Sequence, residues 1–339
     1  MRIHPRQRTR TARRGFTLVE VMVAAALSVV IMTIIATAFQ TGLETLSHLK
    51  SVAGLADRLR AAESVLRNDL AAPHLFNTTT TQEVPVSDSS VTLWTGLDKQ
   101  GFFRMVTPAS TVEATTDRYG LGSSRATNHW LHFTVRLPGT VPEEAFSTQA
   151  PQAVWQSPVN MAGLASPGQF ASRWAEVAYF LEPQLGATTL PDTGPGLPLH
   201  TLRRRQRVIA NADISAVPPF NEFDYPELSS NSTTGVNTPS TITDPNNRLG
   251  NRTRPMAIMP YPLPTGDYRG SDIVLDNVIS MRLKALYDDF AEYTDLPSPL
   301  TEWDSATNPA VGGHRLRAIR IQLRIYDPKN RITRQVTID

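Results

Sequence analysis

The chain has 339 residues and no cysteine, and its 33 basic and 31 acidic residues give a formal net charge of +2. The absence of cysteine excludes a disulfide framework and thiol chemistry, and the length allows a sizeable buried core in one or two domains. Six of the basic residues are arginines within the first 15 positions, which hold no acid, so the rest of the chain has 27 basic and 31 acidic residues. The basic pI therefore does not indicate a nucleic-acid-binding protein.

After this basic leader, the chain continues into a long apolar run. Residues 13–20 read Arg-Arg-Gly-Phe-Thr-Leu-Val-Glu, and residues 21–43 carry no formal charge. Residues 18–39 are enough to cross a bilayer, and a positive flank is typical of the cytoplasmic side of a membrane segment. Glu20 is unusual here, because a carboxylate at the centre of a membrane helix costs roughly 2.5–3.5 kcal/mol. A partner for Glu20 is therefore expected.

The sequence Gly-Phe-Thr-Leu-Val-Glu at positions 15–20 closely resembles the cleavage and methylation site of type IV prepilins and type II secretion pseudopilins. In that family a prepilin peptidase cuts after the glycine and methylates the new N-terminal phenylalanine. The resemblance implies cleavage between Gly15 and Phe16 and N-methylation of Phe16. Glu20 then becomes the fifth residue of the mature chain, and we expect it to pair with the Phe16 amine of a neighbouring subunit or of its own chain during filament assembly. The alternative is a tolerated glutamate near the membrane interface that snorkels to the headgroups.

Two export signals and a plain membrane anchor are alternatives to this interpretation. Ala-Thr-Ala at residues 36–38 is a plausible signal-peptidase site, and residues 13–18 approximate a twin-arginine pattern. Both signals expect a shorter apolar core of roughly 7–15 residues, and neither explains a glutamate inside it. The prepilin interpretation is therefore favoured.

Apolar residues continue at three- and four-residue steps beyond the membrane-length segment, and no proline occurs between residues 41 and 70. This spacing predicts an amphipathic continuation of the same helix over residues 41–72, ended by Pro73. The first half of the helix is then lipid-facing or buried in a filament, and the second half packs on a globular domain. The predicted stripe consists of Leu43, Leu46, Leu49, Val52, Leu55, Leu59, Ala62, Leu66 and Leu70.

The remainder of the chain predicts β-strands. The clearest strand is 319–325, whose strict alternation buries one face, and a turn at 327–330 leads into a second strand at 331–338 to form a hairpin. Other β-prone runs cover residues 130–136, 176–181, 199–209 and 277–287. A leading helix followed by antiparallel strands indicates an α+β, pilin-like fold in which the helix packs on the sheet.

Two stretches are poor in core-forming residues. Residues 77–90 are rich in Thr and Ser, and residues 227–251 are rich in Ser, Thr, Asn and Pro, with a proline-rich tract following at 255–264. We predict mobile surface insertions near 77–90 and 227–264. The predicted organisation is a leader over 1–15, a transmembrane or filament-core helix over 16–40, its amphipathic continuation over 41–72, and a β-rich head over 73–339.

The order of motifs in the head is similar to J-type minor pseudopilins and W-type minor pilins. Those families have a helix that ends in Arg-x-Asp-Leu, then strands with aromatic-x-Thr, Val-x-Tyr-x-Leu and Leu-x-Arg-Arg patterns, and a later strand that leads to a tryptophan. The matching residues are Arg67, Asp69 and Leu70; Phe133 and Thr134; Val177, Tyr179 and Leu181; Leu202, Arg203 and Arg204; and Val278, Met281, Leu283 and Trp303. This similarity covers most of the chain and implies a low-copy subunit at the tip or in initiation of a filament.

No pattern in the sequence favours catalysis, a cofactor or a metal. No H-E-x-x-H, G-x-S-x-G or phosphate-loop pattern occurs, and His129 and His132 are interpreted as ordinary strand histidines whose spacing points them to opposite faces. Residues 244–247 lack the ligand spacing of a calcium loop and predict a turn, as do residues 288–289. The run Arg203-Arg204-Arg205 is interpreted as a solvated strand face. We therefore predict no enzymatic activity and no cofactor.

The sequence thus predicts a minor structural subunit of a type II secretion or type IV pilus-like filament. It is expected to be a single-pass protein of the bacterial inner membrane, with a cytoplasmic N-terminus and a periplasmic head. The expected partners are prepilin peptidase, other pseudopilins or pilins, the inner-membrane assembly platform and the lipid bilayer, and no nucleic acid. The alternative is a membrane-tethered, exported β-rich binding domain that enters no filament and uses its Ser/Thr/Asn-rich loops for ligand contacts.

Overall fold

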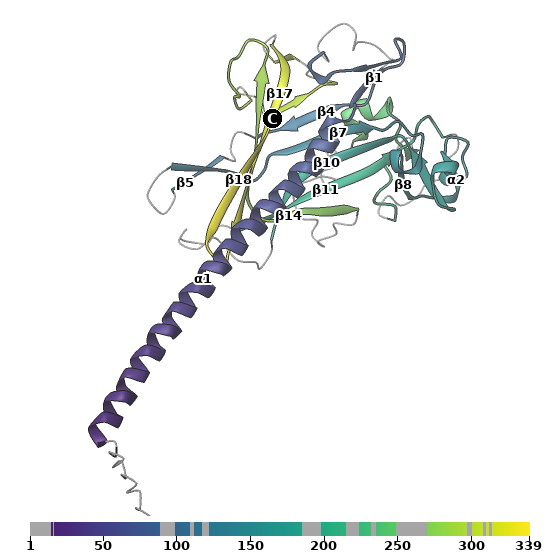
Figure 1. The fold of residues 1–339 in the computed structure, drawn as a ribbon. Coiled ribbons are helices and arrows are strands. Elements are labelled where there is room, and N and C mark those ends of the chain that lie inside the picture. The colour runs from purple at the N-terminus through teal and green to yellow at the C-terminus, as the bar shows by residue number, and fades with distance from the viewer. Residues whose placement is uncertain are drawn as a thin grey trace, which may run out of the picture. The chain divides into compact units, whose positions relative to one another are not determined.

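The computed structural model describes residues 15, 17–88, 99–108, 112–116, 122–184, 198–214, 224–231, 235–248, 270–296, 300–307, 310–311 and 314–339. It contains one long helix followed by antiparallel strands (Figure 1), which confirms the predicted α+β fold. The chain divides into two compact units, Met1–Ala53 and Gly54–Asp339. The leader residues 1–14, Phe16 and the proline-rich tract 255–264 lie outside the described residues.

Helix α1 spans Leu18–Ala71. Its sequence is rich in Ala and Leu, which favour helix, and holds no proline. It ends just before Pro73, as predicted, because a proline disfavours helical backbone in the residue that precedes it. Among the described residues, α1 is the one helix long and apolar enough to cross a membrane.

The predicted apolar stripe of α1 is correct only in the second unit. Leu43, Leu46 and Leu49 of the first unit are 64 %, 64 % and 59 % exposed, whereas Leu55 and Leu59 are each 4 % exposed. The buried positions are Leu55, Leu59, Ala62 and Leu66, at steps of four, three and four residues along one face. The packed part of the helix therefore begins about three turns later than the sequence pattern predicted.

The head is built on a nine-stranded sheet with strand order β15-β4-β7-β10-β11-β14-β17-β16, and β18 pairs with β17 beside β16 (Figure 1). Every ladder of this sheet is antiparallel. Its strands are β4 Phe103–Val106, β7 Trp130–Arg136, β10 Trp174–Pro183, β11 His200–Ile209, β14 Ser271–Tyr287, β15 Glu302–Asp304, β16 Ala310–Val311, β17 His314–Asp327 and β18 Ile332–Ile338.

Shorter elements surround this sheet. They include two-stranded ladders, one three-stranded ladder, one short helix and several 3-10 turns. Their bounds are β1 Leu75–Asn77, β2 Gln82–Val84, β3 Lys99–Gln100, β5 Val112–Thr116, β6 Gly122–Ala126, β8 Phe146–Gln149, β9 Gln169–Ser172, β12 Ser230–Asn231, β13 Gly235–Val236, α2 Gln152–Trp155, η1 Val86–Asp88, η4 Pro142–Glu144, η5 Ala162–Leu164, η6 Thr241–Thr243 and η7 Pro245–Asn247.

The core lies between the buried face of α1 and one face of the large sheet. Alternate residues of β17, Ile321, Leu323 and Ile325, are fully buried in it, as the alternating pattern predicted. Leu59 and Leu66 of the helix belong to the same cluster. The predicted C-terminal hairpin is confirmed, since β17 and β18 pair from Asp327↔Ile332 to Ile321↔Ile338.

Residues 77–90 were predicted to form a mobile surface insertion. Residues 78–83 are exposed at the surface, and residues 75–88 contain a hairpin and a 3-10 turn. β1 and β2 pair around residues 78–81, where the Asn77 side chain accepts hydrogen bonds from the Thr79 and Thr80 amides at 2.9 and 3.1 Å. The Asn side chain replaces backbone partners in the turn, which a composition count does not register. Residues 89–90 lie outside the described part of the chain.

The described part of 227–251 differs from the prediction of a surface insertion. Ser229, Asn237 and Arg248 are fully buried. The side-chain amide of Asn237 donates from Nδ2 to Ser229 Oγ at 3.0 Å and to the Asn247 carbonyl at 2.9 Å. Ser229 Oγ in turn donates to Glu176 at 2.8 Å. This segment is packed largely through buried, hydrogen-bonded polar groups, so its shortage of apolar residues does not make it a surface loop.

Candidate processing and assembly site

The expected cleavage position lies immediately before α1. Gly15 is exposed, and a Cβ added to it would meet no described atom within 4 Å. Packing among the described residues therefore gives no reason for a glycine at this position. Phe16, the other expected residue of the cleavage site, lies outside the described residues.

Glu20 closes a capping box at the N-terminus of α1. The Thr17 amide and hydroxyl donate to Glu20 Oε2 at 2.9 and 3.0 Å, and the Glu20 amide donates to Thr17 Oγ1 at 3.3 Å. These reciprocal bonds satisfy two amides that the first helical turn leaves without intrahelical partners. From sequence, Glu20 was predicted only as a subunit-pairing group. The Thr-x-x-Glu spacing at 17–20 was the signal that could have identified the cap.

The cap uses one oxygen of the Glu20 carboxylate. Its Oε2 accepts both bonds from Thr17, while Oε1 has no hydrogen bond to any described residue. A carboxylate in the first turn is also favoured by the positive end of the helix dipole. The cap therefore lowers the cost of keeping Glu20 in an apolar segment and leaves Oε1 without a hydrogen-bond partner among the described residues.

Hydroxyl side chains form a ladder along the exposed half of α1. Thr33, Thr37, Thr41 and Thr45 each donate to the carbonyl four residues earlier, at 2.8 to 3.0 Å, and Ser28 does the same to Ala24 at 2.8 Å. The polar groups are thus satisfied within the helix, as a helix in lipid requires. These residues are compatible with an apolar environment although they are formally polar.

The far end of α1 is joined to the sheet by a polar cluster of Asp69, Tyr179 and Arg204. Arg204 donates to both Asp69 oxygens, from Nε at 2.6 Å and from Nη2 at 3.0 Å, and the Tyr179 hydroxyl donates to Asp69 Oδ2. Burial raises the pKa of Tyr179, and the neighbouring Asp69 carboxylate raises it further. The hydroxyl therefore remains a proton donor. The predicted solvated face of Arg203-Arg204-Arg205 is corrected, because Arg203 and Arg204 are 15 % exposed and paired with Glu182 and Asp69.

This cluster joins three of the motifs singled out in the sequence. Asp69 comes from the Arg-x-Asp-Leu end of the helix, Tyr179 from the Val-x-Tyr-x-Leu strand β10, and Arg204 from the Leu-x-Arg-Arg strand β11. The pairing Tyr179↔Arg204 between β10 and β11 places these two side chains on the same face. No single motif predicts that these three side chains meet in the folded chain.

A second buried polar cluster lies on the opposite face of β10. Glu176 accepts from His132 at 3.0 Å, from Ser229 at 2.8 Å and from Arg207 Nη1 at 3.4 Å. Burial alone would raise the pKa of Glu176, but the His132 hydrogen bond and the Arg207 charge lower it below its usual value. His129 accepts from the Leu283 amide at 3.1 Å. Both histidines therefore bond to groups of the fold. His132 lies in β7, as predicted, whereas His129 precedes this strand, which begins at Trp130.

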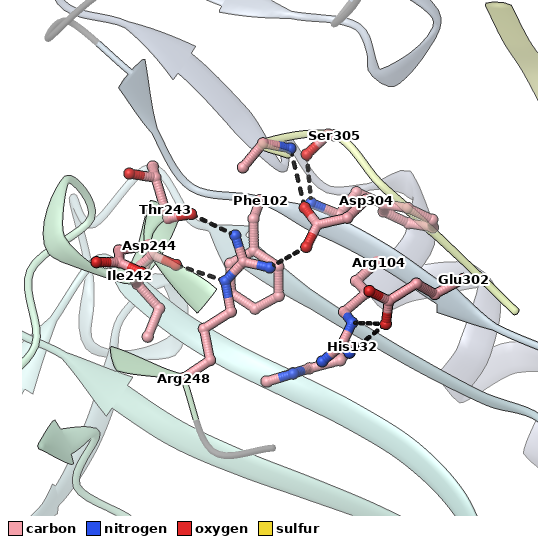
Figure 2. Close-up of polar contacts among 12 residues, drawn as sticks. Phe102, Arg104, His132, Ile242, Thr243, Asp244, Arg248, Glu302, Asp304 and Ser305 are labelled. Atoms are coloured by element: carbon pink, nitrogen blue, oxygen red, sulfur yellow. Dashed lines mark hydrogen bonds and ion pairs between the residues drawn. The ribbon is translucent and has the colours of Figure 1, made fainter. Parts of the chain in front are cut away.

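Figure 2 shows a third cluster, which fixes the end of the 235–248 segment. Arg248 donates to the Ile242 carbonyl at 2.7 Å, to the Thr243 carbonyl at 2.6 Å and to Asp304 at 2.5 Å, and its guanidinium lies 3.8 Å from the centre of the Phe102 ring. The buried charge is therefore fully paired. On the same strand as Asp304, Glu302 pairs with Arg104.

No metal site is found among the described residues, where no group of three or more His, Asp or Glu side chains is placed to hold an ion. Asp244 begins a 3-10 turn and accepts from the Asn246 amide at 2.9 Å, so the predicted turn at 244–247 is confirmed. Residues 288–289 also form a turn, with Asp288 accepting from the Arg315 amide at 3.0 Å.

The long apolar helix and the antiparallel sheet define a pilin-like α+β protein. The family model of the prokaryotic N-terminal methylation motif matches residues 10–36, which include Gly15, Phe16 and Glu20. Comparisons with curated proteins and with solved structures gave no significant match. The motif and the helix together support a type IV pilin-like precursor that is anchored in a membrane by its N-terminal helix. The members of this motif family are structural proteins.

Proposed function

We propose that this chain is a minor pseudopilin or minor pilin, processed by prepilin peptidase between Gly15 and Phe16 and N-methylated on Phe16. The observation that carries the proposal is the methylation motif placed directly before a helix whose first half exposes apolar side chains throughout. A soluble protein would bury such a surface, whereas a membrane or a filament core can cover it. The mature subunit then consists of the helix core over 16–40, its continuation over 41–72 and the head over 73–339.

Glu20 is the proposed subunit-pairing group. After cleavage, the Phe16 amine of a neighbouring subunit, or of the same chain, pairs with the Glu20 carboxylate and neutralises both charges in the apolar filament core. The free Oε1 supports this role, since the carboxylate can accept a new bond without giving up the Thr17 cap. An unpaired carboxylate in that surrounding costs several kcal/mol, so the contact sets the axial register between subunits.

The J-type and W-type branch is the proposed place of this chain within the superfamily. The convergence of Asp69, Tyr179 and Arg204 supports it, because three motifs of that branch supply one cluster. The length of 339 residues also favours this branch over major pilins, which are typically much shorter. A low-copy position at the tip or in initiation follows from the resemblance to that branch.

The proposed topology places residues 1–15 in the cytoplasm, the helix in the inner membrane and the head in the periplasm. The arginine-rich leader supports this orientation through the positive-inside rule. The proposed partners are prepilin peptidase, other pilins or pseudopilins, and the inner-membrane assembly platform.

N-terminal sequencing and intact mass of the full chain, purified from membranes of cells that carry prepilin peptidase, test the processing step. We expect a chain that begins at Phe16 and carries one N-methyl group. Gly15→Leu should leave the leader attached. Gly42→Leu is the matched control, because a Cβ at either glycine meets no described atom within 4 Å.

Two results would overturn the processing proposal. A mature chain that begins at Phe39 would indicate an ordinary secretory signal, and an intact Met1 would indicate a plain membrane anchor. If the chain is processed but never co-purifies with another prepilin-type subunit, the alternative of a tethered binding domain replaces the filament role.

A further inference from the structure

Strand β18 forms one edge of the large sheet. It pairs with β17 over seven consecutive residue pairs without a register shift, and within the described sheet it has no neighbour on its other side. The hydrogen bonds of residues 332–338 to described residues are confined to the β17 ladder. The outward-pointing amides and carbonyls of this strand are therefore available to another strand.

The composition of β18 does little to discourage such pairing. Its sequence Ile-Thr-Arg-Gln-Val-Thr-Ile holds five β-branched residues and neither proline nor glycine. Thr333, Gln335 and Thr337 are exposed, while Val336 and Ile338 pack toward the core and hold the strand in place. A regular, anchored and β-prone edge is a template for a further strand.

The opposite edge of the sheet is closed in several ways. Strand β15 has only three residues, and its central Trp303 is fully buried. The carboxylates on either side of this tryptophan are held by Arg104 and Arg248. Short length and paired charges are the features that protect an edge from another chain. The difference between the two edges indicates that β18 has a binding role that β15 lacks.

The charge around β18 indicates the kind of strand that it accepts. The side chains of Lys329, Arg331 and Arg334 are exposed, and none forms an ion pair with a described residue. The nearby acids are engaged, because Asp327 accepts from the Lys329 amide and the Asn330 side chain, and Asp339 pairs with Arg320 at 2.5 Å. An edge with three available cations favours an acidic partner.

We propose that β18 binds an extended, acidic segment of another protein, which adds to the sheet as a further strand beyond β18. Backbone hydrogen bonds to β18 supply affinity for any extended segment. Carboxylates opposite Arg334, together with the positive charges of Lys329 and Arg331 in the adjoining turn, supply the selectivity. A second copy of β18 fits less well. Antiparallel self-pairing centred on Gln335 sets the two Arg334 side chains on a diagonal, where like charges repel. The proposal does not depend on processing of the N-terminus.

A labelled peptide of about seven alternating glutamate and valine residues is the probe for this edge. We expect it to bind the full chain in detergent micelles, measured by fluorescence anisotropy, while a lysine–valine peptide of the same length does not bind. The double variant Arg331→Glu and Arg334→Glu should lower the affinity for the acidic peptide by roughly tenfold and raise the affinity for the basic peptide. The matched control is Lys50→Glu with Arg60→Glu, which reverses two exposed charges on α1 that have no recorded contact with β18.

Hydrogen exchange identifies where the peptide binds. Amides of residues 332–338 should exchange more slowly when the acidic peptide is present, and those of β15 should not change. Protection elsewhere, equal binding of both peptides, or no binding at low salt would overturn the proposal. A concentration-dependent dimer in sedimentation that is lost in the double variant would also overturn it, in favour of a second copy.

Discussion

The two halves of α1 share one backbone conformation but treat their apolar side chains in opposite ways. In residues 18–53 large apolar side chains are exposed on all sides, whereas in residues 54–71 the apolar side chains of one stripe are buried against the sheet. The apolar side chains of the second half are covered by the core of the same chain. Those of the first half need an apolar cover from outside the chain, either lipid or neighbouring helices. Exposure in the isolated chain thus distinguishes an assembly surface from a packing surface.

The polar anchors of the two halves differ in the same sense. Thr17 and Glu20 bond to each other within the first turn, so they hold the helix end without help from the rest of the chain. Asp69 bonds to Arg204 and Tyr179, more than 100 residues away. The polar contacts of the first half therefore stabilise only the helix itself, whereas those of the second half join the helix to the sheet.

The largest expected effect concerns assembly. Glu20→Leu should abolish co-purification with other prepilin-type subunits while leaving membrane insertion intact, because the pairing carboxylate is lost. Glu44→Leu, on the same exposed half, is the control and should assemble normally. Glu20→Gln separates the two roles of Glu20, since glutamine can close a capping box but carries no charge. If Glu20→Gln assembles like the unaltered chain, charge pairing is wrong and the cap is the function.

The next effect concerns head stability. Leu66→Ala should lower the free energy of unfolding of the head by about 2–5 kcal/mol, because Leu66 is fully buried and its truncation leaves a cavity. Leu46→Ala, at a position that is 64 % exposed, should change it by less than about 0.5 kcal/mol. Urea unfolding followed by tryptophan fluorescence measures this, because all five tryptophans lie in residues 54–339. Equal losses in both variants would contradict the division of the helix.

Acid should destabilise the head through its buried histidines. Burial lowers the pKa of His129 to about 4, and burial together with the Arg125 charge lowers the pKa of His200 to about 4. The unfolded chain binds these protons near pH 6.5, so between pH 6.5 and 4 it holds protons that the folded head does not. Stability is therefore greatest above pH 6.5 and falls as the pH is lowered to 4, by at most about 3 kcal/mol for each histidine.

Urea midpoints measured across this pH range check the histidine prediction. His129→Asn should flatten the slope, because asparagine does not titrate but its carbonyl can accept from the Leu283 amide in place of Nδ1. His48→Asn, on the exposed part of α1, should leave the slope unchanged. A slope that is insensitive to both His129→Asn and the corresponding change at His200 would show that other groups control acid unfolding.

The smallest effect distinguishes two buried tyrosines. Tyr179→Phe should lower the free energy of unfolding of the head by about 1–2 kcal/mol, because it removes a hydrogen-bond donor to the Asp69 carboxylate. Tyr287→Phe should be neutral or slightly stabilising, since the buried Tyr287 hydroxyl has no hydrogen-bond partner among the described residues. The same urea assay compares them. If the two variants lose stability equally, the cluster at the end of α1 contributes nothing specific.

The local features of the fold could be predicted from sequence, and the reasons are physical. The alternation at 319–325 and the helix end at Pro73 depend on periods and backbone restrictions that a single segment carries. The processing motif is likewise a continuous run of residues. The long strand β14 was predicted from 277 but begins at Ser271, because residues 271–275 pair along β11, a partner that the segment alone does not reveal.

The features that sequence could not give depend on pairs of distant residues. Nothing in the Ser/Thr/Asn composition of 227–251 shows that Ser229 and Asn237 would be buried, since their partners lie on β10 and elsewhere in the segment. The Arg248–Asp304 pair links positions 56 residues apart. The position at which packing begins, Leu55, could not be predicted either, because an amphipathic stripe does not indicate where the surface that covers it starts.

The threonine ladder of α1 gives that helix a surface with a repeat. Each hydroxyl from Thr33 to Thr45 turns back to its own helix, so the methyl groups face outward at four-residue intervals. Four residues rise by about 6 Å. A neighbouring helix that slides along this face meets an equivalent surface after each such step, so the face favours contact without fixing the axial offset. The axial offset must therefore be fixed by groups outside the repeat, such as Oε1 of Glu20, which has no hydrogen-bond partner among the described residues.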